Sequence, residues 1–350
     1  MTRAAPVRVH VLVLRRCVPF VSVGVYDLLR KSSELASTLP AAPRRRLEVK
    51  LVSGTSERDV EVAGGLTLSA GAVLATAGAC DVAVVPALDP DVGESVDQNR
   101  AVLPWLSRLH ARGGEIASAC TGAFVLGEAG LLDGRRATTH WAFQKELAER
   151  YPRVELAPQA VVVDDRRVVT AGGATSFINL AHFLVERLLG PEVAWAASRM
   201  FLIDPNKSPQ GAYAIFSSQK DHADEPILRA QEILEREVGS APPVEELARR
   251  VALSQRTFLR RFQAATGEAP RTYGLRVRVE AAKRALERGG SVSEVAARVG
   301  YEDVVAFRKT FSRVVGLTPF EYRTRYGPRS APAVEVSPRR PDRRGAGAKP

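Results

Sequence analysis

The segments Val244-Glu-Glu-Leu-Ala-Arg-Arg-Val251 and Val292-Ser-Glu-Val-Ala-Ala-Arg-Val299 repeat one pattern of apolar, acidic and basic residues. After each segment comes the same series: two phenylalanines four positions apart, a glycine, a proline and a tyrosine. The first series is Phe258, Phe262, Gly267, Pro270 and Tyr273, and the second is Phe307, Phe311, Gly316, Pro319 and Tyr322. Self-similarity of this kind marks a duplicated structural unit.

Each copy has the pattern of a helix-turn-helix unit. In the first copy, Leu247 and Val251 fall on one face of a helix, and Ser254 stands where its hydroxyl can cap the next helix. In the second copy, Ser291 and Glu294 have the spacing of a capping box. Two such units on one chain can present two recognition helices to successive major grooves of duplex DNA.

The second helix of each unit buries its two phenylalanines, so its opposite face is expected to be exposed and to contact DNA. The residues expected there are Gln255, Arg256, Leu259 and Arg260 in the first unit, and Val304, Val305, Arg308 and Lys309 in the second. The alternative is a helical bundle whose charged faces are simply solvated. The matched repeat favours DNA binding, and two copies are too few for a helical solenoid, which needs at least about three.

The distribution of charge agrees with this interpretation. From Glu225 to the C-terminus there are 25 Lys and Arg but 15 Asp and Glu, a net charge of +10 out of +11 for the whole chain. The positive excess therefore lies in the part of the chain that would neutralise DNA phosphates.

The segments 254–270 and 296–323 together resemble the AraC/XylS-type DNA-binding domain. The resemblance implies sequence-specific binding of double-stranded DNA, with RNA polymerase as a possible further partner. Val304 and Val305 depart from the family pattern, in which polar residues are common at the start of the second recognition helix. Apolar side chains at these positions can contact thymine methyl groups.

The first 200 residues have a different pattern, in which short apolar runs alternate with helical segments. This alternation predicts a mainly parallel α/β sheet covered on both faces, with Asp164 and Asp165 forming a hairpin turn. The expected strands are 7–14, 47–52, 81–86, 115–119, 161–163 and 168–171, and the expected helices are 21–39, 100–112, 122–129, 141–150 and 174–189.

The segment Ser118-Ala-Cys-Thr-Gly122 falls where a strand is expected to meet a helix. A turn of this kind can expose Cys120 beside a helix N-terminus, which favours a thiolate, and His140 is a candidate neighbour. The structural alternative is strong, because cysteine is among the most frequently buried residue types.

This turn, with Ala129-Gly-Leu-Leu-Asp-Gly134, Thr138-Thr-His-Trp141 and Thr170-Ala-Gly-Gly173, resembles the ThiJ/PfpI-type, class I glutamine amidotransferase-like domain. The resemblance covers residues 7–200 and is closest to the version found upstream of AraC-type domains in bacterial regulators. It implies a flavodoxin-like, or amidotransferase-like, α/β sandwich followed by an all-α domain with two helix-turn-helix motifs.

Several residues on which the family's enzymes depend are replaced in this chain. Thr121 stands where enzymatic members have His, and Pro86-Ala-Leu88 stands where many have Pro-Gly-Gly. Asp27 and Glu34 do not match the expected acid near the first helix, and Asn179 replaces the usual Asp of the fused relatives. Without a complete triad, no catalytic residue, metal or cofactor is assigned. Cys120, Thr121 and His140 are instead expected to line a pocket for an unidentified small-molecule effector.

Two functions therefore remain: a ligand-controlled transcriptional regulator, which is favoured, and a Cys120-dependent amidase or hydrolase with an autoregulatory DNA-binding domain. The expected organisation is a sensor domain at 1–200, a linker at 201–224, a DNA-binding domain at 225–328 and a disordered basic tail at 329–350. A homodimer is expected. Three cysteines without metal spacing indicate the reducing cytoplasm, and no apolar run approaches the roughly 20 residues of a membrane span.

Overall fold

A computed structural model of the protein describes residues 5–39, 45–204, 208–216 and 218–328. The chain divides into two compact units, one of residues 1–215 with the segment 312–317 and one of residues 216–311 with 318–350. We call residues up to 215 the α/β unit and residues from 216 the helical unit. The expected basic tail at 329–350 lies outside the described residues.

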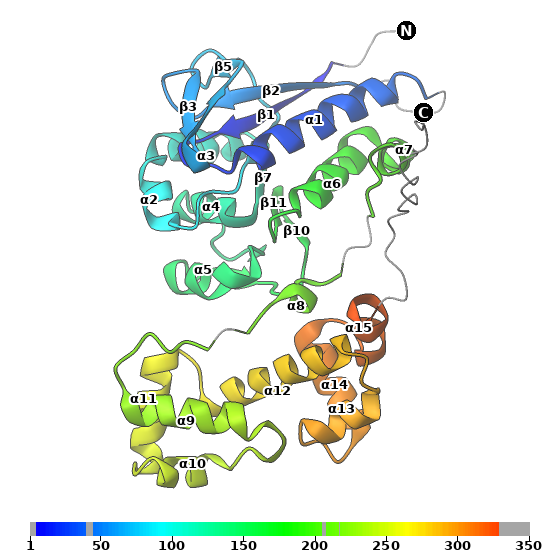
Figure 1. Ribbon diagram of the computed structural model, residues 1–350. Coiled ribbons are helices and arrows are strands. Elements are labelled where there is room, and N and C mark those ends of the chain that lie inside the picture. Colours follow the sequence, from blue (N-terminus) through cyan, green and yellow to red (C-terminus); the bar gives the residue numbers. More distant parts are fainter. Residues whose placement is uncertain (1–4, 40–44, 205–207, 217, 329–350) are drawn as a thin grey trace, which may run out of the picture. The chain divides into compact units, whose positions relative to one another are not determined.

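The α/β unit is built on a seven-stranded sheet with the order β10-β11-β7-β6-β1-β2-β5 (Figure 1). Every neighbouring pair is parallel except β10 and β11, which confirms the expected mainly parallel α/β fold. The strands are β1 Val7–Val13, β2 Leu47–Ser53, β5 Ala72–Val73, β6 Val82–Val85, β7 Glu115–Ala119, β10 Val162–Asp165 and β11 Val168–Ala171.

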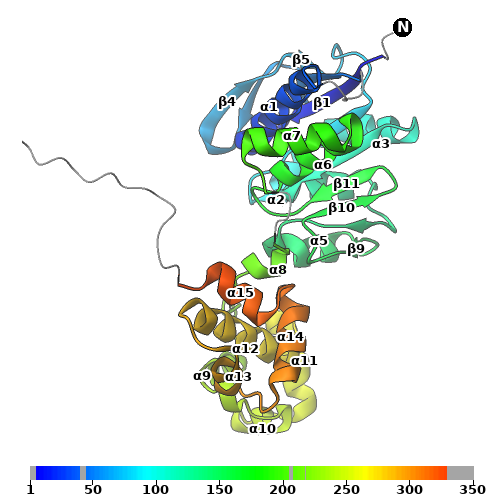
Figure 2. The same cartoon turned by 90° about the vertical axis from the view of Figure 1, so that its right-hand side faces the viewer.

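Helices cover both faces of this sheet (Figures 1 and 2). The consecutive residues Ile116 and Ala117 of β7 enter two different apolar clusters, because successive side chains of a strand point to opposite faces. One cluster includes residues of α1 Pro19–Ala36, α6 Phe177–Leu189 and α7 Pro191–Phe201, and the other includes residues of α2 Val92–Asp97, α3 Leu103–Ala111 and α4 Ala123–Glu128. The near-continuous apolar strands follow from this double burial.

The hairpin between β10 and β11 turns two residues later than expected. Asp164 and Asp165 belong to β10 and pair with Val169 and Val168, so their assignment to the turn is wrong. The turn is made by Arg166 and Arg167, whose φ angles are 52° and 66°. Positive φ at both central positions of the turn matches the twist of the flanking strands. Arginine is not typical of such positions, so the sequence did not indicate a turn there.

Several short elements of the α/β unit had no periodic signal in the sequence. They are the hairpin β3 Asp59–Val62 and β4 Leu66–Ser69, the strands β8 Arg136–Ala137 and β9 Glu155–Leu156, and the helix α8 Gln210–Tyr213. The expected helix 141–150 is present as α5 Gln144–Arg150, preceded by the 3₁₀ turn Trp141–Phe143. Helix α8 falls within the expected linker 201–224 and is part of the α/β unit. Among the described residues, no helix is both long and apolar enough to cross a membrane.

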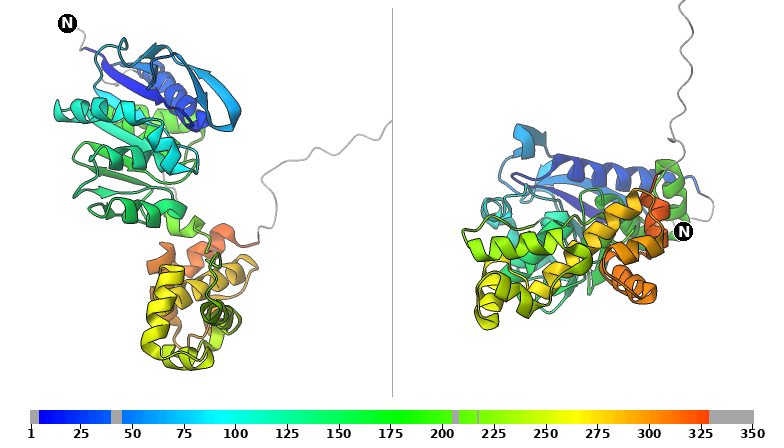
Figure 3. Two further views of the ribbon diagram at one scale, coloured as in Figure 1. Left: turned by 90° about the vertical axis from the view of Figure 1, so that its left-hand side faces the viewer. Right: turned by 60° about the horizontal axis from the view of Figure 1, so that its bottom comes forward.

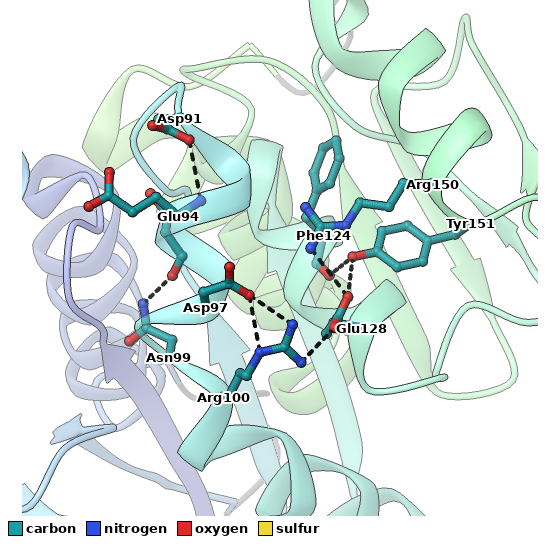
Figure 4. A network of polar contacts seen from close by, with 10 residues as sticks. Asp91, Glu94, Asp97, Asn99, Arg100, Phe124, Glu128, Arg150 and Tyr151 are labelled. Carbon is teal, nitrogen blue, oxygen red and sulfur yellow. Dashed lines mark hydrogen bonds and ion pairs between the residues drawn. The ribbon is translucent and has the colours of Figure 1, made fainter.

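A polar network fixes the end of α4 to its neighbours (Figure 4). The carboxylate of Glu128 accepts hydrogen bonds from Arg100 at 2.8 Å and from the Tyr151 hydroxyl at 2.9 Å. Arg150 approaches the same carboxylate at 3.4 Å. Burial disfavours the charged carboxylate, but the hydrogen bonds from Tyr151 and Arg100 outweigh it and hold the pKa of Glu128 below its ordinary value.

Every secondary-structure element in the described part of the helical unit is a helix (Figure 3), as expected. The long helix α12 joins two pairs of short helices that correspond to the two sequence copies. The helices are α9 Glu225–Arg236, α10 Val244–Arg250, α11 Gln255–Thr266, α12 Pro270–Glu287, α13 Val292–Arg298, α14 Val304–Val315 and α15 Pro319–Tyr326.

The sequence repeat reappears as a repeat in packing. In the first copy the ring centroid of Phe262 lies 5.4 Å from that of Phe258 and 5.4 Å from that of Tyr273. The corresponding distances in the second copy are 5.7 and 5.6 Å, between Phe311 and its neighbours Phe307 and Tyr322. All six rings are buried, so the duplicated aromatic residues form two equivalent small cores.

The helix starts are capped as the sequence predicts. The Ser254 hydroxyl accepts a hydrogen bond from Thr257 N at 3.3 Å, and Ser291 and Glu294 form a reciprocal capping box. These caps satisfy N–H groups that a helix leaves without an internal partner. The turn of the second copy depends on Gly300, whose φ is +83° and where a Cβ would lie 2.3 Å from the carbonyl oxygen of Gly239.

Candidate nucleic-acid interface and sheet-edge site

The helices α11 and α14 expose the faces that the sequence assigned to DNA. In α11, Phe258 and Phe262 are fully buried and Leu259 is 39% exposed, while in α14 Val305 is 54% exposed. Val304 is half-buried. The other expected contact residues, all exposed, are Gln255, Arg256, Arg260, Arg308 and Lys309. Whether they touch DNA stays a prediction.

The basic residues of the helical unit fall into two groups. Arg250, Arg261 and Arg276 are held in ion pairs with Glu237, Asp224 and Glu268 respectively. In contrast, the cations on the exposed faces of α11 and α14 form no ion pair with any residue in the described part of the chain: Arg256, Arg260, Arg308 and Lys309. The first group stabilises the unit itself, whereas the second leaves its positive charge open to an anionic partner.

The same exposed faces also carry apolar side chains. Leu259 and Val305 are among the exposed large hydrophobic residues of the chain, and each lies next to unpaired cations on its helix. Cations suit phosphates and guanine edges, and an aliphatic side chain suits a thymine methyl group in the major groove. The two faces therefore have the mixed chemistry needed to read base edges as well as the charge needed to hold the backbone.

The predicted turn around Cys120 is present at the C-terminal edge of the sheet. Cys120 directly follows β7 and has a φ of 54°, a conformation that non-glycine residues rarely adopt. A Cβ at Gly122 would lie 2.4 Å from the carbonyl oxygen of Pro86, so only glycine allows the turn to pack against the end of β6.

The chemistry of Cys120 differs from that of an activated nucleophile. Its side chain belongs to the apolar cluster beneath α1 and α6, and the residue is 7% exposed. Burial raises the pKa of the Cys120 thiol, contrary to the expectation that the following helix N-terminus favours a thiolate. The first turn there is only the 3₁₀ segment Cys120–Gly122, and the loss of solvation outweighs its dipole.

Thr121 and His140 make contacts that fix the fold around the turn. The Thr121 hydroxyl accepts a hydrogen bond from Leu88 N and donates one to Leu88 O, both at 2.7 Å. His140 Nδ1 accepts from Ala142 N at 3.2 Å, and its ring contacts Trp141. Burial lowers the pKa of His140, which favours the neutral imidazole.

Neither of the two acids considered from the sequence is available to Cys120, because Glu34 pairs with Arg30 and Asp27 pairs with basic residues of its own helix. Asp27 on α1 pairs with Arg30 and Lys31, and its pKa is lowered chiefly by the hydrogen bond from Lys31. Asn179 on α6 lines a hollow of about 420 Å³ with His182 and Gln159 among its other walls. The structure therefore places these residues outside a recognisable acid–base pair with Cys120.

One residue at this edge of the sheet, Gln210, was not predicted from the sequence. Gln210 of α8 is 4% exposed, and its amide nitrogen lies 2.9 Å from Thr138 Oγ1, 3.0 Å from Thr139 O and 2.8 Å from Ala160 O. Thr139 also donates a hydrogen bond of 2.8 Å to the carbonyl oxygen of Cys120. These contacts join residues that are far apart in the chain, so no local sequence pattern predicts them.

Comparison with known proteins agrees with both halves of this description. Residues 28–187 match the DJ-1/PfpI family, and residues 247–325 match a helix-turn-helix domain family. A putative transcriptional regulator from Vibrio parahaemolyticus has the fold of the α/β unit, with a TM-score of 0.50 and 22% identity over 57% of this chain and all of that one.

Two curated relatives match different lengths of the chain. The HTH-type transcriptional regulator CdhR of Pseudomonas aeruginosa is 30% identical over 237 residues, which are 67% of this chain and 70% of that protein. Isonitrile hydratase of Pseudomonas putida is 35% identical over 172 residues, 49% of this chain and 67% of that protein. With both domains matched in order, the chain belongs to the family of HTH-type transcriptional regulators that join a DJ-1/PfpI domain to an AraC-type helix-turn-helix domain.

Proposed function

We propose that this protein regulates transcription by sequence-specific binding of double-stranded DNA, with α11 and α14 reading two successive major grooves. The observation that carries the proposal is the set of unpaired cations on the exposed faces of two equivalent helices, Arg256 and Arg260 on one and Arg308 and Lys309 on the other. Arg260 and Lys309 stand at equivalent positions of the two units, because each follows the first buried phenylalanine of its helix by two residues. A solvated surface has no need for such a match. RNA polymerase is a further partner that such a regulator can recruit.

The proposal is tested by selecting binding sites for the full chain from a random duplex library, followed by footprinting. Two protected elements about one helical turn, near 10 bp, apart are expected. Arg256→Ala should relax base preference in one element and Arg308→Ala in the other. Arg250→Ala is the control, because Arg250 is held by Glu246 and Glu237. Uniform protection without a preferred site would refute specific regulation.

We further propose that a small molecule bound at the C-terminal edge of the sheet controls DNA binding. Open α/β sheets bind ligands outside the carboxyl ends of their strands, and the turn at Cys120 and the segment after β11 both lie at that edge, since Ala119 pairs with Ala171. Cys120 and His140 are the candidate residues for such a pocket. Thr121 contributes indirectly, by holding Leu88 in place.

A Cys120-dependent enzyme is the second candidate, favoured by the likeness to isonitrile hydratase and by the unusual φ of Cys120. The raised pKa of the buried Cys120 thiol argues against it, because the thiolate is the nucleophile. Incubation of the full chain with an alkyl isonitrile and with simple amides tests this. Turnover that is absent in Cys120→Ser would establish the enzyme, whereas no turnover with an effector response altered by the same substitution would support the sensor.

We also propose that the protein acts as a homodimer in the cytoplasm, paired through the α/β unit. Helices α1 and α7 lie side by side (Figure 1) and carry Phe20 and Trp195, which are 59% and 64% exposed. Large aromatic side chains left in water on neighbouring helices are typical of an association surface. Cys17, Cys80 and Cys120 are all free thiols, which suits a reducing compartment.

A further inference from the structure

The carboxamide of Gln210 occupies a preformed group of oxygen atoms at the C-terminal edge of the sheet. We call the three atoms around its nitrogen, Thr138 Oγ1, Thr139 O and Ala160 O, the acceptor cradle. Both threonines are fully buried. The Thr138 hydroxyl itself donates to Ala160 O at 3.1 Å. The acceptor capacity that this bond leaves faces one nitrogen, and such an enclosed set of oxygens suits an N–H donor because a buried acceptor is costly without a partner.

The acceptor cradle is positioned by bonds that do not involve Gln210. Thr138 N donates to the Thr170 hydroxyl at 2.9 Å, which fixes the segment to β11. Thr139 Oγ1 donates to Cys120 O at 2.8 Å, which fixes it to the turn after β7. The oxygens are therefore held in place by the sheet itself, whichever donor group fills the cradle.

Gln210 fills this site imperfectly. A primary amide nitrogen has two hydrogens, yet three oxygens surround it at 2.8 to 3.0 Å. Its own carbonyl oxygen, Oε1, is buried without a hydrogen-bond partner among the described residues. Exchanging the nitrogen and oxygen of the amide would let the oxygen accept from the Thr138 hydroxyl, but it would place that oxygen against the carbonyl oxygens of Thr139 and Ala160, which is worse. A buried acceptor without a partner costs free energy. This cost weakens the binding of the Gln210 side chain in the cradle, so another N–H donor can compete with it.

The segment that carries Gln210 is also short. Helix α8 comprises only Gln210–Tyr213, and it lies between the last large helix of the α/β unit, α7, and the first helix of the helical unit, α9. Besides the cradle contacts, Gln210 N donates to Gln159 O at 3.1 Å and Gly211 N donates to Gln159 Oε1 at 2.9 Å. Displacement of Gln210 would therefore free α8, the last helix of the α/β unit before α9 in the chain.

We propose that the acceptor cradle is a subsite of the effector pocket for a small molecule with a primary carboxamide group, and that Gln210 is its internal competitor. The three oxygens are uncharged, which favours a neutral amide over an ammonium ion whose buried charge they do not balance. This inference rests on the proposed control of DNA binding by the α/β unit. It adds that the ligand is a primary carboxamide and that its binding releases α8.

The test is rescue of Gln210→Ala in the full chain. This substitution removes an acetamide-sized group, so acetamide should refill the cradle and raise the melting temperature of the variant by roughly 2–4 °C. Acetate has nearly the same shape but presents only acceptors, and it should have no such effect. Wild type, whose cradle is filled, should respond to neither. Equal shifts with acetamide and acetate, or an equal shift in wild type, would overturn the proposal.

Two further variants test the geometry. Thr138→Val removes one cradle oxygen and should abolish the acetamide rescue when combined with Gln210→Ala. Gly172→Ala leaves the cradle intact but places a Cβ 2.0 Å from the Gln210 amide nitrogen, so limited proteolysis should cut faster near α8. Faster cleavage supports displacement of Gln210 even where Gln210→Ala folds poorly, and unchanged cleavage contradicts it.

The DNA affinity of Gln210→Ala for the selected site is then measured with and without acetamide. This measurement distinguishes carboxamide binding in the cradle from an effect of that binding on DNA affinity. A change of about fivefold or more in the dissociation constant, the lower range for coupled sites, supports both. A melting-temperature rescue with unchanged DNA affinity would overturn the role of the cradle as an effector subsite. The DNA-binding proposal would survive that result, because it depends on footprinting alone.

Discussion

The guanidinium of Arg261 donates hydrogen bonds of 2.8 and 2.6 Å to the two carboxylate oxygens of Asp224, the residue that caps α9. Its neighbour in sequence, Arg260, is exposed on α11 and has no ion-pair partner in the described part of the chain. Two adjacent arginines thus differ in whether they form an ion pair. Arg261 ties α11 to α9, whereas Arg260 presents its charge to the solvent.

This difference predicts opposite effects of two neighbouring substitutions. Arg260→Ala should weaken binding to the selected DNA site by about 1–3 kcal/mol and leave the melting temperature unchanged. Arg261→Ala should lower the melting temperature, because Asp224 loses its partner, while base preference stays the same. Competition binding and thermal unfolding of both variants check this. Loss of base preference in Arg261→Ala alone would place the reading face on the wrong side of α11.

The pair of hydrogen bonds between Thr121 and Leu88 predicts a structural role for a residue that stands at a catalytic position in related enzymes. Thr121→Val keeps the shape but leaves Leu88 N and O without partners, and it should cost about 1–3 kcal/mol of stability. Thr121→Ser retains the hydroxyl and serves as the control. Denaturant unfolding of both variants gives the comparison. Equal stability of Thr121→Val and wild type would show that the loop after β6 does not depend on this residue.

Features that depend on neighbours in the chain were predictable from the sequence, and features that depend on burial were not. The caps at Ser254 and Ser291 follow from residues three positions apart, and the phenylalanine pairs follow from helical spacing. The protonation state of Cys120 depends instead on the apolar cluster around it. Gln210 contacts Thr138, which is 72 positions away, so no window of sequence could reveal that it enters the sheet edge.

The network around Glu128 predicts how stability of the α/β unit changes with pH. Because the pKa of Glu128 is lowered in the folded protein, its stabilising contribution is present above the ordinary pKa, about 4.3, and is lost as pH falls through the folded value. Glu128→Gln should therefore lower the melting temperature most near neutral pH, and the difference from wild type should shrink below about pH 4.

Thermal unfolding across pH compares this variant with Glu57→Gln, since Glu57 is exposed and forms no ion pair with a described residue. The control should follow the wild-type curve at every pH. A pH-independent difference between Glu128→Gln and wild type would mean that packing against Tyr151, rather than the carboxylate charge, is responsible.

The basic tail predicts a change in salt dependence without a change in sequence preference. Residues after Arg329 include five Lys and Arg but two acidic residues, so they can attract phosphates. Their deletion should make the plot of log affinity against log salt shallower, because fewer counterions are released on binding. Selection of DNA sites with the truncated protein is the matched measurement. A different preferred site would show that the tail contacts bases.

The exposed aromatic residues of α1 and α7 predict where the dimer forms. Trp195→Asp places a charge in the proposed interface and should convert the full chain to monomers, because an unpaired charge buried at an interface is strongly unfavourable. Leu66→Asp is the control: Leu66 is 57% exposed but lies on β4, away from both helices in sequence. Sedimentation velocity distinguishes the two species at equal concentration. If Leu66→Asp dissociates the dimer and Trp195→Asp does not, the interface lies on the β3–β4 hairpin instead, and the two aromatic residues need another partner.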